Sequence, residues 1–111
     1  MPYDEGLAER VREALKSDEG ITEKQMFGGL AFMSRGYMFV GIAAEALMAR
    51  VGPQDYEDAL RRPFAREMDF TGKPMKGYVF VDPPGFESDF DLSEWVRRCH
   101  GFIQTLPPKK P

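Results

Sequence analysis

Apolar positions recur at helical spacing near the start of the chain. Leu7, Val11, Ala14 and Leu15 fall on one side of a helix, with charged residues between them. This pattern predicts an amphipathic helix over residues 4–17, which ends before Gly20. A helix with one apolar side needs the apolar surface of another element to cover.

The final part of the chain carries a longer apolar stripe. Asp91 and Glu94 have the spacing of a capping box and predict the start of a helix. The positions that then share one side of this helix are all apolar, namely Leu92, Trp95, Val96, Cys99, Phe102, Ile103 and Leu106. We expect this stripe to be the largest single contribution to the core.

Short apolar runs between these helices predict strands, because glycine, proline and polar residues bound them. Runs at 24–33, 37–42 and 46–51 predict an antiparallel meander. Gly28 and Gly29 interrupt the first run, and glycine inside a strand is typical of a bend or bulge. We therefore expect the glycine pair to bend one long strand.

A second helix and a second strand pair follow. Gly52 and Pro53 are expected to begin the helix, since proline suits a first helical position, and Pro63 ends it. Runs at 66–70 and 75–81 predict a hairpin. The residues that connect its strands are Thr71, Gly72, Lys73 and Pro74.

The predicted order is α-β(3)-α-β(2)-α, a two-layer α+β fold with three helices on a mostly antiparallel five-stranded sheet. The strand runs are apolar on both faces, whereas a sheet with one solvated face alternates apolar and polar residues. Something must then cover the second face. We expect a symmetric partner subunit, and therefore a homodimer.

Chain length, hydropathy and cysteine content limit the class of protein. At 111 residues the chain has the size of one domain, so we expect a single domain over residues 1–106 and a flexible Pro/Lys tail at 107–111. No apolar run approaches the ~20 residues that span a bilayer, and the acidic start does not resemble a secretory signal. The single cysteine cannot form an internal disulfide. These features favour a cytoplasmic protein without a membrane partner.

The net charge of −3 argues against direct binding of nucleic acid, whose phosphates an acidic surface repels. Arginines and lysines occur in small groups interleaved with acids, which is typical of a solvated surface.

Catalytic chemistry is not evident in the sequence. Cys99 and His100 are adjacent, and neighbouring helical residues point about 100° apart, so we interpret Cys99 as a packing residue. One cysteine and one histidine are too few for a tetrahedral metal site. Glycine motifs for phosphate or dinucleotide binding are absent too. We expect no catalytic residues, metal or cofactor.

Two segments remain as candidates for binding. The first contains Phe27, Gly28 and Gly29, and the second contains Thr71, Gly72, Lys73, Met75 and Lys76. Backbone amides in these segments, together with Lys73 or Lys76, could hold an anion. The methionines in or beside the predicted strands suit core packing, and adaptable protein recognition is the alternative.

The same segments carry a family resemblance. The runs KQMFGGLAFM at 24–33, RVG at 50–52 and MDFTGKPMKGYV at 68–79, with Trp95-Val96 and LPPK at 106–109, are similar to the N-terminal domain of the TfoX/Sxy competence regulators. The resemblance implies a secretion-chaperone-like α+β fold, which agrees with the predicted order. It also implies a part in transcriptional regulation, and it brings no catalytic residues with it.

Two functions therefore stand as hypotheses. One is a non-enzymatic cytoplasmic interaction module that holds a protein partner, for which the resemblance suggests the transcription machinery. The other is a small-molecule or anion-binding protein, or an unrecognised enzyme, with a pocket at the two glycine-containing segments.

Overall fold

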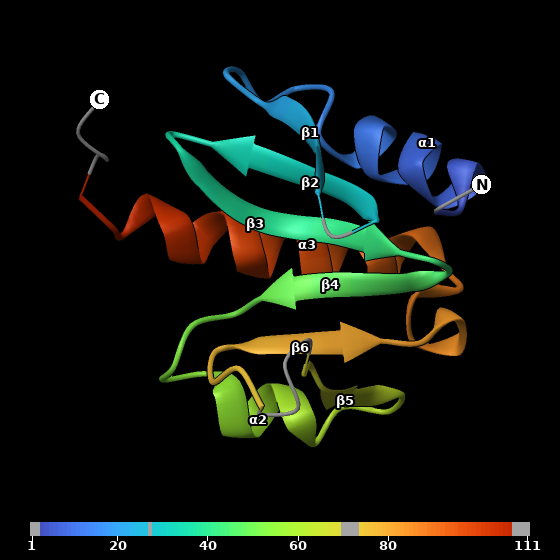
Figure 1. Cartoon of the computed structure of the whole chain (residues 1–111), viewed down its shortest axis with the longest axis vertical. Coiled ribbons are helices and arrows are strands. Elements are labelled where there is room, and N and C mark those ends of the chain that lie inside the picture. Colours follow the sequence, from blue (N-terminus) through green and yellow to red (C-terminus); the bar gives the residue numbers. More distant parts are fainter. Residues whose placement is uncertain (1–2, 27, 70–73, 108–111) are drawn as a thin grey trace.

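The chain folds into two layers, with helices packed on one face of an antiparallel sheet (Figure 1). The computed structural model describes residues 3–26, 28–69 and 74–107. In chain order the elements are α1 (Glu5–Ala14), β1 (Thr22–Met26), β2 (Gly29–Ser34), β3 (Tyr37–Ala43), β4 (Ala46–Arg50), α2 (Tyr56–Leu60), β5 (Ala65–Glu67), β6 (Tyr78–Val81), the 3-10 helix η1 (Pro83–Phe86) and α3 (Asp89–Gln104). The predicted α+β class and the three helices are confirmed.

The sheet has six strands in the order β1-β2-β3-β4-β6-β5. Every neighbouring pair is antiparallel, and the predicted hairpin between β5 and β6 is present. One row of directly paired residues crosses its centre from Leu30 through Ile42 and Leu47 to Val81. All four side chains are buried under the helices, so this row fixes which side of the sheet faces the core.

Six strands form where five were predicted, because the glycine pair reverses the chain. β1 and β2 are antiparallel neighbours, with Met26 paired to Gly29. Gly28 has a φ of 74°, a left-handed conformation that glycine adopts without penalty. Gly29 faces the backbone of β3, and a Cβ there would lie 2.1 Å from the carbonyl oxygen of Ile42. The predicted bend in one long strand was therefore wrong, and a hairpin takes its place.

The core between the helices and the sheet contains the predicted α3 stripe. Leu92, Trp95, Val96, Cys99 and Ile103 are all buried in it. On the other side of this core lie the apolar residues of the central strands, and α1 adds Leu7, Ala8, Val11 and Leu15. The last helix thus has the role in packing that its periodicity predicts.

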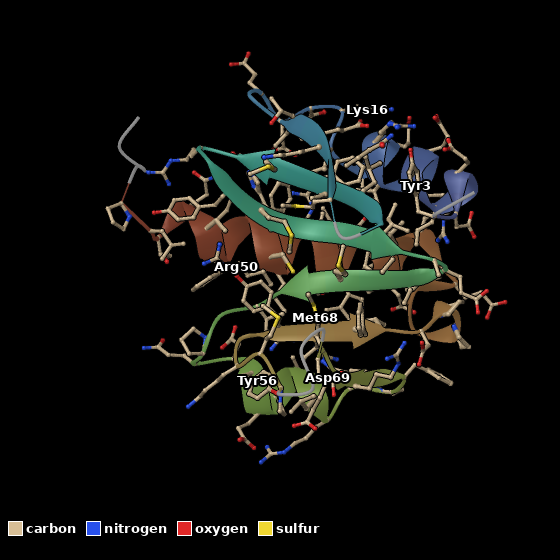
Figure 2. All side chains as sticks on the ribbon, in the orientation of Figure 1. Tyr3, Lys16, Arg50, Tyr56, Met68 and Asp69 are labelled. Carbon is tan, nitrogen blue, oxygen red and sulfur yellow. The ribbon has the colours of Figure 1, made fainter. Side chains whose placement is uncertain are left out.

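The second face of the sheet has a small apolar cluster of its own. Met48 of β4 and Phe80 of β6 are buried there with Ala46 and Met68, and Met75 packs against them. Figure 2 shows Met68 beside β4 and β6, on the side of the sheet away from α3. Met68 and Met75, which lie between β5 and β6 in the chain, therefore cover part of the face for which we expected a partner subunit.

Helix ends differ from the prediction by a few residues. The Oγ of Ser88 accepts a hydrogen bond from the Asp91 amide at 3.0 Å, so Ser88 is the N-cap of α3 and the capping box predicted at Asp91 was placed too late. The first helix ends at Ala14, and the second begins at Tyr56 rather than at Pro53. These are shifts of boundary and leave the element order intact.

Among the helices of the described residues, none is long and apolar enough to cross a membrane.

Candidate functional site

The two segments predicted as a binding site lie on different parts of the sheet. Gly28 lies in the turn between β1 and β2, and Gly29 is the first residue of β2. Met75 packs on the second face over β4 and β6, and its amide donates to the Met68 carbonyl at 2.9 Å. Lys76 is exposed. Phe27, Thr71, Gly72 and Lys73 lie outside the described residues.

Three clefts of the described surface are lined by residues other than Gly28, Gly29, Met75 and Lys76. The first, which we call the α2–α3 groove, has a volume of about 790 Å³. It lies between α2, η1, the start of α3 and the residues between α2 and β5. It is lined by Asp55, Asp58, Arg62, Pro63, Phe64, Pro84, Gly85, Phe90, Asp91, Glu94, Trp95, Arg97 and Arg98.

Two aromatic side chains of the groove are directed largely to solvent. Phe64 is 53% exposed and Phe90 is 72% exposed, and these are the large apolar side chains of the described residues that are left mostly uncovered. Phe64 also has a φ of 68°. A bulky residue rarely adopts this left-handed conformation, which costs about 1–2 kcal/mol. The fold therefore holds an exposed aromatic ring in an unfavourable backbone conformation.

Close packing fixes the wall of the groove that carries Phe64. Gly85 of η1 lies against it, since a Cβ on Gly85 would be 3.1 Å from the Pro63 carbonyl oxygen and 3.2 Å from the Phe64 Cβ. The Phe64 carbonyl accepts a hydrogen bond from the Asp82 amide at 2.9 Å, just before η1. The segment after α2 and the segment before α3 are thus joined where Phe64 is presented.

The opposite wall joins α3 to α2 through Arg98. Its guanidinium donates to the Asp58 carboxylate at 2.7 Å, lies 3.7 Å from the Asp55 carboxylate, and sits 5.8 Å from the ring centre of Trp95. The hydrogen bond from Arg98 lowers the pKa of Asp58, so that carboxylate stays ionised. Trp95 is buried beneath this contact and forms the floor on that side.

The rim carries charges of both signs. Arg62 and Arg97 are exposed and form no ion pair with a described residue, and the same is true of Asp91 and Glu94. The groove thus combines exposed apolar rings with solvated charges around them. Such a surface suits an amphipathic partner with an apolar anchor and a polar surround.

Cys99 lies in the core, away from solvent. Its side chain is fully buried, and burial raises the pKa of the thiol to about 12. His100 is directed elsewhere, with its ring edge-on to Phe39 at 5.2 Å between centres. In the described residues, His, Cys, Asp and Glu side chains form no group of three that could hold a metal ion.

A comparison with protein families identifies the family to which the chain belongs. A family model described as the TfoX N-terminal domain matches residues 13–103, most of the 111-residue chain. The chain belongs to the TfoX N-terminal domain family. This confirms the resemblance read from the glycine-containing segments. Searches of curated proteins and of solved structures each gave no significant match.

For this TfoX N-terminal domain, sequence reasoning missed the aromatic pair of the groove. Phe64 follows Pro63 in a connecting segment, and nothing in the sequence reports its exposure or its φ. Phe90 could have been found, because it is a large apolar residue outside the core stripe of the last helix. Placing the helix start at Asp91 left it outside the helix.

Proposed function

We propose that the protein is a cytoplasmic regulatory module that binds a protein partner through the α2–α3 groove. Membership of the TfoX N-terminal domain family supports a regulatory role of the competence-regulator type, and the resemblance suggests a partner in the transcription machinery. The groove adds a surface on which such a partner would be recognised.

The observation that carries this proposal is Phe64. Backbone strain persists where the surrounding structure enforces it, and it occurs preferentially at functional sites. Here the strained residue presents a half-exposed aromatic ring at the edge of the groove, with Phe90 lining the same groove. Burial of exposed aromatic rings by a partner provides much of the binding energy at protein interfaces.

The charge distribution favours a protein over a small anionic ligand. The lining includes four carboxylates, of Asp55, Asp58, Asp91 and Glu94, and three guanidiniums. Two of the carboxylates already engage Arg98. A surface of mixed sign gives orientation and specificity to a protein contact and offers no concentrated positive field for a phosphate.

The alternative is the small-molecule, anion or enzyme site predicted at the glycine-containing segments. It stays a prediction, because Thr71, Gly72 and Lys73 lie outside the described residues. Lys76 belongs to that site and is not among the residues that line the groove, so substitutions at Lys76 and at Phe64 separate the two hypotheses.

The test is affinity capture from native cytoplasm with the full chain as bait, followed by quantitative mass spectrometry. The baits are wild type, Phe64→Gly and Lys76→Ala. Glycine adopts the φ of residue 64 freely, so Phe64→Gly removes the ring while the local backbone is preserved. A matched thermal melt of each bait verifies that all three are folded.

We expect one protein to be enriched by wild type and by Lys76→Ala, and to fall about tenfold or more with Phe64→Gly, as for loss of an interface hot spot. A protein lost with Lys76→Ala and retained with Phe64→Gly would contradict the proposal and favour the loop site. Enrichment of no protein by the wild type would contradict the module itself.

A further inference from the structure

The outward side of α3 carries an unusual set of residues. Phe90, Glu94, Arg97 and Gly101 are all exposed. At about 100° per residue they fall within roughly 60° of one another, opposite the buried stripe that contains Cys99. This outward stripe contains a 72% exposed phenylalanine and a glycine inside the helix, three residues before its last residue.

Neither Gly101 nor the exposed ring of Phe90 stabilises the isolated chain. Glycine in a helix interior costs about 1 kcal/mol relative to alanine. A Cβ on Gly101 would meet nothing within 4 Å, so packing within the chain does not require glycine there. Phe90 likewise leaves most of its ring in solvent. Within one chain, no side chain fills the space beside Gly101, and the Phe90 ring is left mostly exposed.

The two features match under two-fold symmetry. The midpoint between Phe90 and Gly101 falls between Trp95 and Val96, and so does the midpoint between Glu94 and Arg97. A two-fold axis at that point would run a second α3 antiparallel to the first. Phe90 of each copy would then face Gly101 of the other, about 8 Å along the helix from the axis.

The charges match under the same operation. Glu94 of each copy would face Arg97 of the other, close to the axis, and this would form two equivalent ion pairs. Neither residue forms an ion pair with a described residue of its own chain. Phe90 and Gly101 are eleven residues apart, about three helical turns, so the stripe runs nearly straight along α3. Two nearly straight helices can stay in contact over that length.

We infer that the outward stripe of α3 is a self-association surface and that its partner is a second copy of this chain, paired antiparallel through α3. The contact is isologous, so each copy uses the same residues. It lies on the helix layer rather than on the second face of the sheet, where the sequence led us to expect a subunit. The stripe overlaps one edge of the α2–α3 groove, because Phe90, Glu94 and Arg97 also line that groove, so a second copy and a protein partner would compete for this edge.

The test is sedimentation velocity of the full chain between about 1 and 100 µM in low salt, where ion pairs across an exposed contact are least screened. Gly101→Gln fills the slot with a neutral side chain that the isolated helix accommodates. Glu94→Arg and Arg97→Glu each place like charges opposite one another across the axis. The double variant restores opposite charges, and Glu45→Arg, in the exposed turn between β3 and β4, is the matched control.

We expect the wild type, Glu45→Arg and the double charge variant to approach twice the 12.6 kDa monomer mass. Gly101→Gln should weaken association at least tenfold while raising the thermal midpoint, since it also improves helix propensity. Glu94→Arg and Arg97→Glu should each be monomeric alone and should form a dimer when mixed.

A monomeric wild type at the highest concentration would overturn the inference. Dimerisation that survives Gly101→Gln, or a double charge variant that fails to recover, would overturn it too. Phe64 is not part of the stripe, so Phe64→Gly should leave self-association unchanged, and this separates a failure of the inference from a failure of the proposed function.

Discussion

Replacing Gly29 by alanine should destabilise the protein far more than the same change at its neighbour Gly28. A Cβ on Gly29 would lie 2.1 Å from the Ile42 carbonyl oxygen and 3.1 Å from its carbonyl carbon. Both atoms belong to the backbone of β3, which cannot rotate away as a side chain could. A Cβ on Gly28 would meet nothing within 4 Å, and only its φ of 74° opposes alanine there.

The sizes of the two effects follow from these distances. Ordinary contact with a Cβ begins near 3.4 Å, so β2 and β3 must separate by roughly 1 Å to admit the Gly29 methyl group. Overpacking of this kind costs about 2–3 kcal/mol. A left-handed alanine at Gly28 costs about 1 kcal/mol. Gly101→Ala, in open space on a helix, should stabilise by about 1 kcal/mol.

Urea unfolding measures all three variants. Trp95 is the only tryptophan and is buried, so its fluorescence reports the loss of the core. The free energy of unfolding falls by about 1.5 kcal/mol per M urea for a chain of this size. The midpoint of urea unfolding should therefore fall by roughly 1.5 M for Gly29→Ala and by less than 1 M for Gly28→Ala. It should rise for Gly101→Ala. Equal midpoints for Gly28→Ala and Gly29→Ala would refute the reasoning from backbone contact.

Three further outcomes are expected. Ser88→Ala removes the cap on the Asp91 amide and should lower the free energy of unfolding by about 1 kcal/mol, measured by urea; an unchanged midpoint would contradict the cap. The Arg12 guanidinium lowers the pKa of Glu23, so this pair stabilises the fold above the ordinary value of 4.5 and loses its effect as pH falls through the folded-state pKa. Glu23→Gln should therefore be less stable than wild type at pH 7, and the gap should close in acid; a constant gap would count against the ion pair. Iodoacetamide at pH 8 should label Cys99 only after unfolding, since burial raises the pKa of its thiol to about 12, and rapid native labelling would disprove that burial.

Much of the fold could be predicted because periodicity reports directly on burial. The stripe through Leu92, Val96 and Cys99 identified the helix that faces the core, and the apolar runs identified the strands. The glycine pair was interpreted wrongly, since glycine between two apolar runs fits both a bend and a turn. The pairing of β1 with β2, which places Met26 opposite Gly29, shows that the chain turns at the glycines.

The sequence also did not indicate what covers the second face of the sheet. Apolar residues on both faces of β2, β3 and β6 indicated that something covers each face. They could not indicate what does so. The structure places Met68 and Met75 of the same chain over Met48 and Phe80. A segment that folds back on its own sheet and a partner subunit leave the same apolar pattern in a strand.

The groove was the least predictable feature. Its distinguishing properties are the φ of Phe64, the exposure of Phe90 and the packing of Gly85 against Pro63. Each of these depends on how α2, η1 and α3 sit together, and propensity or spacing does not encode that arrangement. Arginines in this region, such as Arg98, appeared in the sequence only as part of a solvated surface.

The most direct test of the groove as the binding surface is an amide and indole chemical-shift map of the full chain, titrated with the protein that the capture experiment identifies. The account predicts that the largest shifts fall at Phe64, Phe90 and the single indole of Trp95, with Gly28, Gly29 and Lys76 unmoved. Shifts concentrated at Gly28, Gly29 and Lys76, with the Trp95 indole unchanged, would contradict it.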